Sequence, residues 1–290
     1  MMKKLITTLC TLSLLIAPTV TAFAASTSIY ETESNDSIAT AQEVSRNIVT
    51  AANTVYSRYD GQNVVKGSLS SSTDVDWYKV YLPEGKQTLS INSTALSSSG
   101  IWNIYDSDGN LIDAIHHTQN SSKYPGATPY TVTIPSSNLY YIEVTSGSSN
   151  SSGSYLFTIG NPNYSVDGVS YTASSPLKLT TTTSSTQGTY DLNSLNVPDN
   201  AIAYAVSIEG STTNNATNQS RNIKASSDSS WITTSAYTYN ADIPVINNKY
   251  VKDKWTVNLT GNVSKYSNPF TLYPKLHFSY VYAIVPNFEK

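Results

Sequence analysis

The chain has 290 residues, of which only 13% are charged, and its formal net charge is −3. Such a mildly acidic chain argues against nucleic acid or an anionic membrane as a partner, because both call for a basic surface. Ser, Thr, Asn and 22 Tyr take the place of charged residues. This composition is typical of secreted β proteins, whose strands carry Thr and Tyr on half-buried faces.

The N-terminus predicts a secretory signal peptide over residues 1–25. Two lysines precede an apolar run from Leu5 to Ala17, and Ala22-Phe-Ala24 offers a cleavage site. The run is too short for a retained transmembrane helix. The single cysteine, Cys10, lies within it, so the mature chain cannot depend on disulfides. We expect a secreted, extracellular protein without membrane contact after cleavage.

Residues 26–160 are expected to form a first β-sandwich. The run from Trp77 to Leu82 alternates between two faces, so one of these faces must lie in a core. Ile38–Val44 offers the one plausible helical turn. Further short strands are expected at residues 64–69, 87–93, 101–105, 111–115, 130–134, 139–144 and 155–159. Short strands at regular spacing with almost no helix predict an all-β sandwich.

Gly160-Asn-Pro-Asn163 is the best boundary, and residues 161–290 are expected to form a second β-sandwich of unknown ligand. Residues 210–220 are polar and of low complexity, which favours a loop. The strands of this half are expected at residues 175–182, 201–208, 230–239, 254–259 and 276–285. The two halves share β character but no repeated motif.

Two oxygen-rich clusters each lie next to a β segment. The first is Glu31-Thr-Glu-Ser-Asn-Asp-Ser37, and the second is Asp74 with Asp76. Carboxylate and amide oxygens from two such clusters are what a hard cation such as Ca²⁺ requires. Residues 31–36 are also compatible with a solvated acidic linker in which Asn35-Asp36 caps a helix that starts near Ser37.

The order and spacing of several blocks resemble the bacterial pre-peptidase C-terminal domain, a family that includes the collagen-binding domains of clostridial collagenases. The resemblance covers about residues 29–160. It implies a jelly-roll-like sandwich that serves secreted peptidases as an accessory module. The blocks are the acidic segment 31–37, Asp74-Val-Asp-Trp-Tyr78, Tyr105-Asp-Ser-Asp-Gly-Asn110, Tyr140-Tyr-Ile-Glu-Val144 and Gly153-Ser-Tyr155.

The resemblance also implies a set of calcium ligands. One position departs from the family pattern, because this chain has Thr73 where the collagenase domains have an acid, and Asp74 is its expected substitute. The positions that match the ligands of calcium-binding members are Glu31, Glu33, Asn35, Asp36, Ser68 and Asp76.

The residues speak against collagen as a partner. Collagen-binding members carry tyrosine followed by lysine after the Tyr-Tyr strand, whereas this chain has Thr145 and Ser146. An aromatic anchor is the usual hot-spot residue of an interface, and Thr-Ser cannot replace it.

The motifs of known catalytic sites are missing, so we expect no enzyme. The sequence holds no G-x-S-x-G, no H-E-x-x-H and no glycine-rich phosphate loop. His116 and His117 end a predicted strand, where adjacent side chains face opposite ways. His277 lies in a strand pattern. A hydrolase with a Ser-His-Asp triad through His277 stays open, although no serine stands out as its nucleophile.

Aromatic residues of the second half give a rival hypothesis. Trp231, Trp255, Tyr237 and Tyr239 would form a sugar-stacking platform if they were exposed, or core and interface aromatics if they were not. The sequence therefore favours a secreted accessory or binding protein with a calcium-stabilised sandwich. An adhesin or polysaccharide-binding surface protein is the alternative, and an extracellular protein or a polysaccharide is the expected partner.

Overall fold

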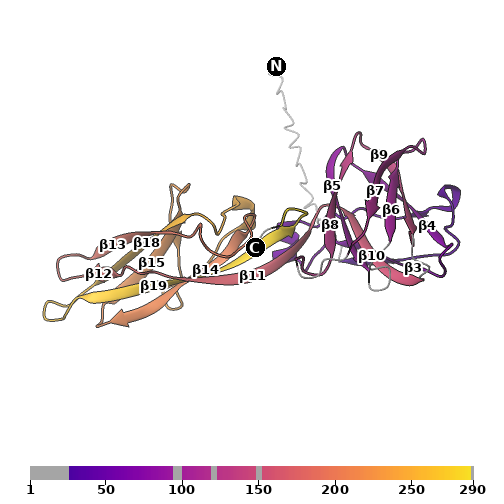
Figure 1. Ribbon diagram of the computed structural model, residues 1–290. Helices are drawn as coiled ribbons and strands as arrows, with labels where there is room; N and C mark the ends of the chain where they lie inside the picture. The colour runs from indigo at the N-terminus through magenta and orange to yellow at the C-terminus, as the bar shows by residue number, and fades with distance from the viewer. Residues whose placement is uncertain (1–25, 94–99, 119–122, 148–151, 289–290) are drawn as a thin grey trace, which may run out of the picture.

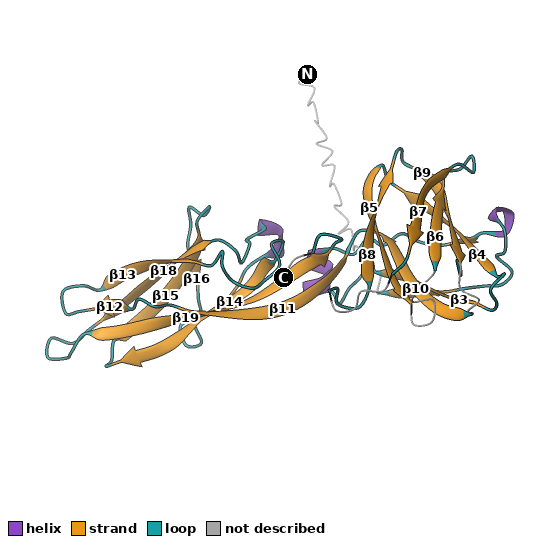
Figure 2. Ribbon diagram, viewed as in Figure 1, coloured by secondary structure: helices purple, strands orange, loops and turns teal. Residues whose placement is uncertain are grey.

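The computed structural model describes residues 26–93, 100–118, 123–147 and 152–288, so the expected signal peptide lies outside the described residues (Figure 1). Strands dominate, as expected (Figure 2). The helical segments in the described part of the chain are η1 (Ile38–Thr40), α1 (Ala51–Tyr56) and η2 (Val245–Asn247). None of these helices is long and apolar enough to cross a membrane.

The first β-sandwich is a jelly roll. Its sheet A has the order β1 (Thr27–Tyr30), β3 (Asn63–Leu69), β10 (Gly153–Gly160), β5 (Gly85–Ser93), β8 (Thr128–Ile134). Its sheet B has the order β2 (Gln42–Glu43), β4 (Val75–Leu82), β9 (Asn138–Thr145), β6 (Ile101–Tyr105), β7 (Leu111–His116). From β3 onward the chain crosses between the sheets at every step except the β6–β7 hairpin, which is the jelly-roll pattern.

The alternation of β4 is confirmed. Tyr78, Val80 and Leu82 are buried in the core between the two sheets, while Tyr81 on the other face is 58% exposed. Ile104, Ile142 and other alternating residues of β5, β6, β8, β9 and β10 complete this core. The period-two pattern therefore selects the core face correctly.

The second β-sandwich follows in residues 163–284. Its sheet C has the order β11 (Asn163–Thr172), β19 (Phe270–Ile284), β14 (Ile202–Thr213), β17 (Asn240–Asp242), and β12 (Leu177–Leu179) also pairs with β19. Its sheet D has the order β13 (Ser185–Asp191), β18 (Lys254–Asn262), β15 (Thr217–Ala225), β16 (Ile232–Thr233). A separate apolar cluster fills the space between them.

Two sequence expectations for this half are wrong. Residues 210–220 are not a loop, because β14 continues to Thr213 and β15 begins at Thr217. Their Thr, Ser and Asn side chains are mostly exposed, so the strands lack the apolar alternation that marks a half-buried strand. Only Ile232–Thr233 of the expected strand 230–239 forms one, and Tyr239 ends this segment with a positive φ of 55°.

The two sandwiches meet in a packed junction. Gly160 has a φ of 130°, and a Cβ there would lie 2.4 Å from the carbonyl oxygen of Asn47, so only glycine fits. Buried Asn47 donates from Nδ2 to the carbonyl oxygen of Asn161 at 2.8 Å. Tyr124 packs into the second core and donates from its hydroxyl to the carbonyl oxygen of Pro286.

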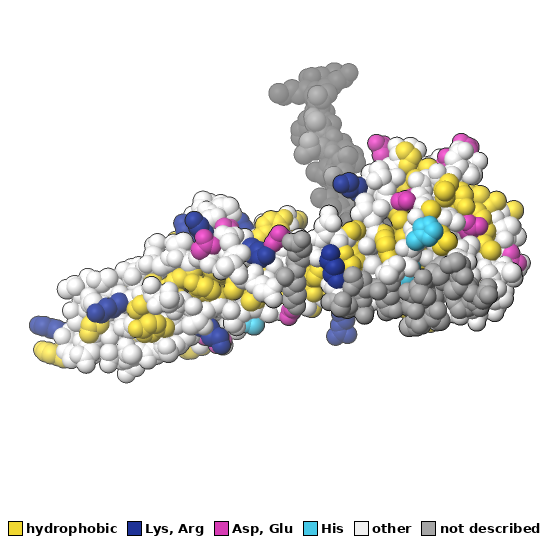
Figure 3. Space-filling view, in the orientation of Figure 1, with side chains coloured by type: hydrophobic (Ala, Val, Ile, Leu, Met, Phe, Trp, Pro, Cys, Tyr) yellow, Lys and Arg dark blue, Asp and Glu magenta, His cyan; other side chains and the backbone are white. Residues whose placement is uncertain are grey.

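Helix α1 adds to this junction. It contacts β11, β19 and η2 of the second sandwich, and the hydroxyl of Tyr56 accepts a hydrogen bond from the backbone of Val245 at 3.3 Å. This helix was not expected, and the expected turn at 38–44 is a 3-10 turn followed by β2. On the face drawn in Figure 3, Lys and Arg side chains are scattered rather than gathered in a basic patch.

Candidate metal centre

The acidic segment 31–37 crosses from one sheet of the first sandwich to the other. The backbone N–H of Glu31 donates to the carbonyl oxygen of Lys66 at 2.9 Å, which extends the pairing of β1 with β3. The backbone N–H of Trp77 in β4 donates to the carbonyl oxygen of Asn35 at 2.8 Å. Both ends of the crossing are thus fixed by backbone hydrogen bonds, and Glu33 lies between them.

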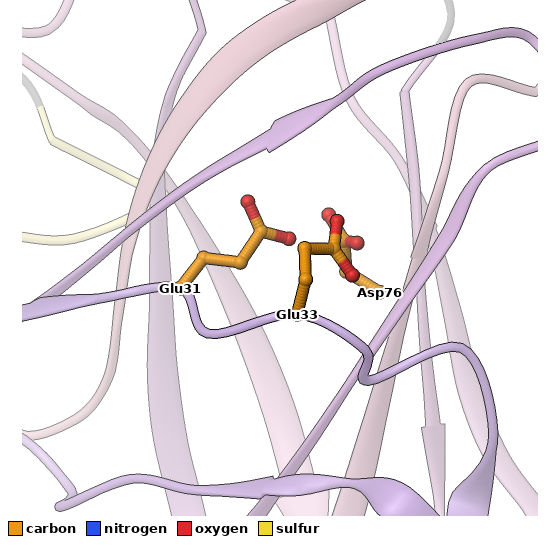
Figure 4. A group of neighbouring side chains, drawn as sticks. All are labelled: Glu31, Glu33 and Asp76. Carbon is orange, nitrogen blue, oxygen red and sulfur yellow. The ribbon is translucent and has the colours of Figure 1, made fainter.

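Three carboxylates converge where this segment passes the start of β4. Glu31, Glu33 and Asp76 each offer one oxygen, and these oxygens all lie within 4.8 Å of one another (Figure 4). Asp76 is fully buried, Glu31 is half-buried and Glu33 is exposed. The cluster therefore has a closed side at Asp76 and an open side at Glu33.

One oxygen of each inner carboxylate is anchored by the protein. Glu31 accepts the backbone N–H of Ser68 at Oε2 (2.8 Å), and Asp76 accepts the hydroxyl of Tyr155 at Oδ2 (2.5 Å). The hydroxyls of Tyr155 and Tyr78 lie 2.7 Å apart. A Cβ at position 67 would come within 2.4 Å of the Tyr155 hydroxyl, so Gly67 makes room for this arrangement.

The remaining polar atoms of the cluster have no partner. Oε1 of Glu31 and Oδ1 of Asp76 are buried and unbonded, and so are both amide atoms of Asn35, which is 0% exposed. A buried polar group without a hydrogen bond costs about 1–3 kcal/mol, and such groups are rare in native proteins. Several of them beside three carboxylates indicate a site for a bound cation.

The electrostatics agree with this interpretation. Burial, together with the neighbouring Glu31, raises the pKa of Asp76 to about 8. Partial desolvation, and the charge of Glu31 after it, also raises the pKa of Glu33. Without a cation these carboxyl groups resist ionisation, whereas a divalent cation at the same place would favour their charged forms.

The donor set fits Ca²⁺. Every candidate ligand atom is an oxygen, from three carboxylates and the amide of Asn35. Hard cations prefer such ligands, and Ca²⁺ takes six to eight of them in a flexible geometry. Bidentate carboxylates and water on the open side of Glu33 would complete the shell.

The other expected ligands do not join the cluster. Asp74 accepts the backbone N–H groups of Ser70 (2.5 Å) and Val75 (2.9 Å), so it holds its own turn. Asp36 is exposed and shares a neighbouring hollow with Asp74. Ser68 contributes a backbone N–H rather than an oxygen. Sequence reasoning missed Tyr78, Tyr155 and Gly67, of which only the inward position of Tyr78 in the β4 alternation gave a signal.

The sugar platform expected in the second sandwich does not form. Trp255 is fully buried against Phe278, with ring centroids 4.8 Å apart, so the expectation that it binds a ligand is wrong. The guanidinium of Arg221 lies 3.7 Å from the ring centre of Tyr239. Trp231 is half-buried below Lys224. Tyr237 alone of the four is freely open, at 95% exposure.

The histidines form no catalytic triad among the described residues. His277 is exposed, and its Nδ1 lies 3.0 Å from Oγ of Ser170, a serine that the sequence did not single out. No carboxylate of the described chain hydrogen-bonds this imidazole. His117 is buried and His116 is exposed. Ser146, at the expected position of a collagen-contacting lysine, is buried as well.

Comparison with known proteins agrees with the resemblance noted in the sequence. The family model of the bacterial pre-peptidase C-terminal domain matches residues 74–146. This stretch contains Asp76 but not the acidic segment 31–37. No curated protein matches the chain.

Several solved structures are similar. A candidate secreted protein from Eubacterium rectale has 13% identity and a TM-score of 0.52, with 91% of this chain and 87% of that chain covered. The pre-peptidase C-terminal domain of collagenase from Bacillus anthracis has 14% identity and a TM-score of 0.30, with 41% of this chain and 93% of that chain covered. At these identities the likeness to the first structure concerns the fold.

Proposed function

Because residues 74–146 match the family model of the bacterial pre-peptidase C-terminal domain, we propose that the chain is a secreted, non-catalytic accessory protein whose first sandwich is stabilised by Ca²⁺. The observation that carries this proposal is the convergence of Glu31, Glu33 and Asp76 around unpartnered buried oxygens. Its expected partner is an extracellular protein or a polysaccharide.

The cation would connect the two sheets of the first sandwich. Glu31 and Glu33 lie on the segment that leaves sheet A, and Asp76 lies at the start of β4 in sheet B. A single ion bound to all three would tie the N-terminal edge of one sheet to the other. Because the unfolded chain does not hold these carboxylates together, the ion would bind the folded state alone and stabilise it by mass action. A secreted sandwich without cysteines would thereby resist unfolding and proteolysis.

The non-catalytic part of the proposal rests on chemistry. His277 faces Ser170 on an exposed sheet surface and has no carboxylate among the described residues to orient it. A Ser-His pair needs such a group, and an oxyanion hole, to act as a hydrolase. The described carboxylates that do cluster bring one oxygen each within 4.8 Å of the others, which supports a metal site rather than a catalytic one.

Thermal melts and calorimetric titration of residues 26–290 test the proposal. We expect the melting temperature to be higher in Ca²⁺ than in EGTA. When the free ion exceeds its Kd a hundredfold, the free energy of unfolding should rise by about 2.7 kcal/mol. Asp76→Asn should abolish both the shift and the binding heat. Glu84→Gln removes an exposed carboxylate of the same sandwich and should leave both unchanged.

The same variants separate a metal ligand from a merely structural carboxylate. Asp76→Asn keeps an acceptor for the hydroxyl of Tyr155 but removes a buried carboxyl group whose ionisation the folded state disfavours. In EGTA it should therefore melt at or above the wild-type midpoint. The proposal would be contradicted if Ca²⁺ did not change the melting temperature of the wild type, or if it still raised the melting temperature of Asp76→Asn.

A further inference from the structure

A pocket of about 270 Å³ lies at the junction of the two sandwiches. Its floor is the outer face of sheet A, where Val64, Leu156 and Thr158 point away from the core. Its roof comes from the start of β11, the end of β19 and residues 125–127. Neither sandwich alone would form it, and such junctions are common places for small-ligand sites.

The floor carries polar groups that the protein leaves unused. Ser90 and Asn92 are two residues apart in β5, so their side chains share the outer face. Ser90 is only 2% exposed because the roof covers it, and its Oγ has no hydrogen-bond partner. The amide of Asn92 bonds to none of the described residues. Buried hydroxyls are normally satisfied, so these groups indicate a ligand.

The roof contains an anchor and a contact surface. Oδ1 of Asn163 accepts hydrogen bonds from Asn47 (3.2 Å), Gln62 (3.3 Å) and Thr158 (3.3 Å), which fixes the start of β11 over sheet A. That oxygen is therefore already used. The next residue, Tyr164, is half-buried at the pocket and makes no hydrogen bond within the described chain. Its ring and hydroxyl are free for a ligand.

The lining selects a chemical class. No charged side chain lines the pocket in the described part of the chain, so nothing there would compensate the charge of an ionic ligand. An apolar ligand would leave the hydroxyl of Ser90 and the amide of Asn92 unpaired, which costs affinity. A neutral sugar presents hydroxyls to such groups and an apolar ring face to an aromatic side chain.

We propose that this pocket binds one neutral sugar unit, with Ser90 and Asn92 as its hydrogen-bonding floor and Tyr164 as its aromatic wall. The volume is just below the range of about 300–1,000 Å³ for drug-sized ligands, which suits a single ring of a longer glycan. The pocket does not involve the carboxylate cluster, so binding is independent of the calcium proposal.

Saturation-transfer NMR of residues 26–290 with glucose, galactose or N-acetylglucosamine at millimolar concentration tests this inference. We expect transfer from at least one of these sugars in both Ca²⁺ and EGTA. Asn92→Ala should weaken binding about tenfold, the equivalent of one lost hydrogen bond of about 1.4 kcal/mol. Tyr164→Ala should weaken it at least as much.

Thr131→Ala serves as the matched control, because Thr131 lies exposed on β8 of the same sheet and does not line the pocket. It should bind like the wild type. A ¹H–¹⁵N spectrum of each variant verifies folding, and Ser90→Ala is the milder second variant if Tyr164→Ala is unfolded. The inference fails if no neutral sugar gives transfer, if glucuronate binds better than glucose, or if Asn92→Ala binds unchanged.

Discussion

The two sandwiches of this chain differ in the polar side chains that they bury. Both lack disulfides, yet among the described residues nearly all buried polar side chains, tyrosine and tryptophan aside, belong to the first sandwich and the junction. Arg221 and Thr234 are the exceptions in the second. The first sandwich keeps unbonded carboxylate oxygens in its interior, whereas the second fills its interior with apolar side chains. On our proposal a bound cation completes the first core, whereas packing alone completes the second.

Arg221 shows how the second sandwich handles a buried charge. Its Nη1 donates to the carbonyl oxygen of Ile208 at 2.6 Å, and its guanidinium stacks on Tyr239. The guanidinium is therefore hydrogen-bonded and stacked within the protein, although its Nε has no hydrogen-bond partner. Among the described residues no cation pairs with the carboxylate of Asp76, so we expect the stability of the first sandwich to depend on pH and on added Ca²⁺.

The largest effect should come from the packed core. Trp255→Ala removes a fully buried ring that contacts Phe278 and should cost about 3–5 kcal/mol. Chemical denaturation followed by fluorescence measures the loss, which should be the same in Ca²⁺ and EGTA. The matched control is Tyr237→Ala, with its ring 95% exposed, which should change stability by less than about 0.5 kcal/mol. If the stability loss of Trp255→Ala differed between Ca²⁺ and EGTA, the second sandwich would not be independent of calcium, as we expect it to be.

The second effect is the pH dependence of the stability of the metal-free first sandwich. The pKa of Asp76 rises from 3.8 to about 8 on folding, so the folded state keeps a proton that the unfolded chain has lost. In EGTA, stability should therefore fall as the pH rises from about 4 to about 8. The loss is on the order of 3 kcal/mol once screening on the open Glu33 side is allowed for.

Thermal melts across this pH range measure the effect. Asp76→Asn should flatten the profile in EGTA, and saturating Ca²⁺ should do so in the wild type, because the ion binds the deprotonated form. Glu84→Gln should keep the wild-type slope. An EGTA profile that rises over this range would show that Asp76 is stabilised by the protein itself.

The sequence predicted those parts of the molecule that local pattern determines. The alternation from Trp77 to Leu82 predicted the inward face of β4. The two oxygen-rich clusters and the family resemblance predicted a larger ligand set, which included Glu31, Glu33 and Asp76. Local pattern could not separate Asp74 from Asp76, because that depends on which oxygens the turn amides at Ser70 and Val75 capture.

Long-range packing explains the other misses. Trp231 and Trp255 look equivalent in sequence, but only Trp255 lies on the inner face of β18, opposite Tyr190 of β13 and Ala225 of β15. The pairing of 210–213 with β19 rests on partners some sixty residues away, such as Gly210 with Pro274. A polar segment gives no local signal of such a partner.

A third effect concerns the buried charge of Arg221 in the second sandwich. Arg221→Met keeps most of the side-chain length but leaves the carbonyl of Ile208 without its donor and should cost about 1–3 kcal/mol. Denaturation in Ca²⁺ and EGTA should give equal losses. Lys224→Met, at a half-buried position three residues along β15, is the control and should cost less. A larger loss of stability in Lys224→Met than in Arg221→Met would contradict the stabilising role of the buried guanidinium.

The smallest effect concerns acid stability of the calcium-bound first sandwich. His117 is buried, its Nδ1 lies 3.1 Å from the Tyr130 hydroxyl, and burial lowers its pKa from 6.5 to about 4. The unfolded chain takes up a proton first, so stability is complete above about pH 6.5 and falls as the pH drops towards 4. This contribution is on the order of 1–2 kcal/mol.

His117→Phe keeps a ring beside Trp102 and cannot be protonated, so in acid it should lose less stability than the wild type. Exposed His116 provides the control, because His116→Phe should leave the loss of stability between pH 7 and pH 4 unchanged. Melts from pH 7 to pH 4 in saturating Ca²⁺ give the difference between the two variants. Equal acid limbs would mean that His117 gains a compensating partner when protonated, and that the interior around Trp102 tolerates charge as the Arg221 site does.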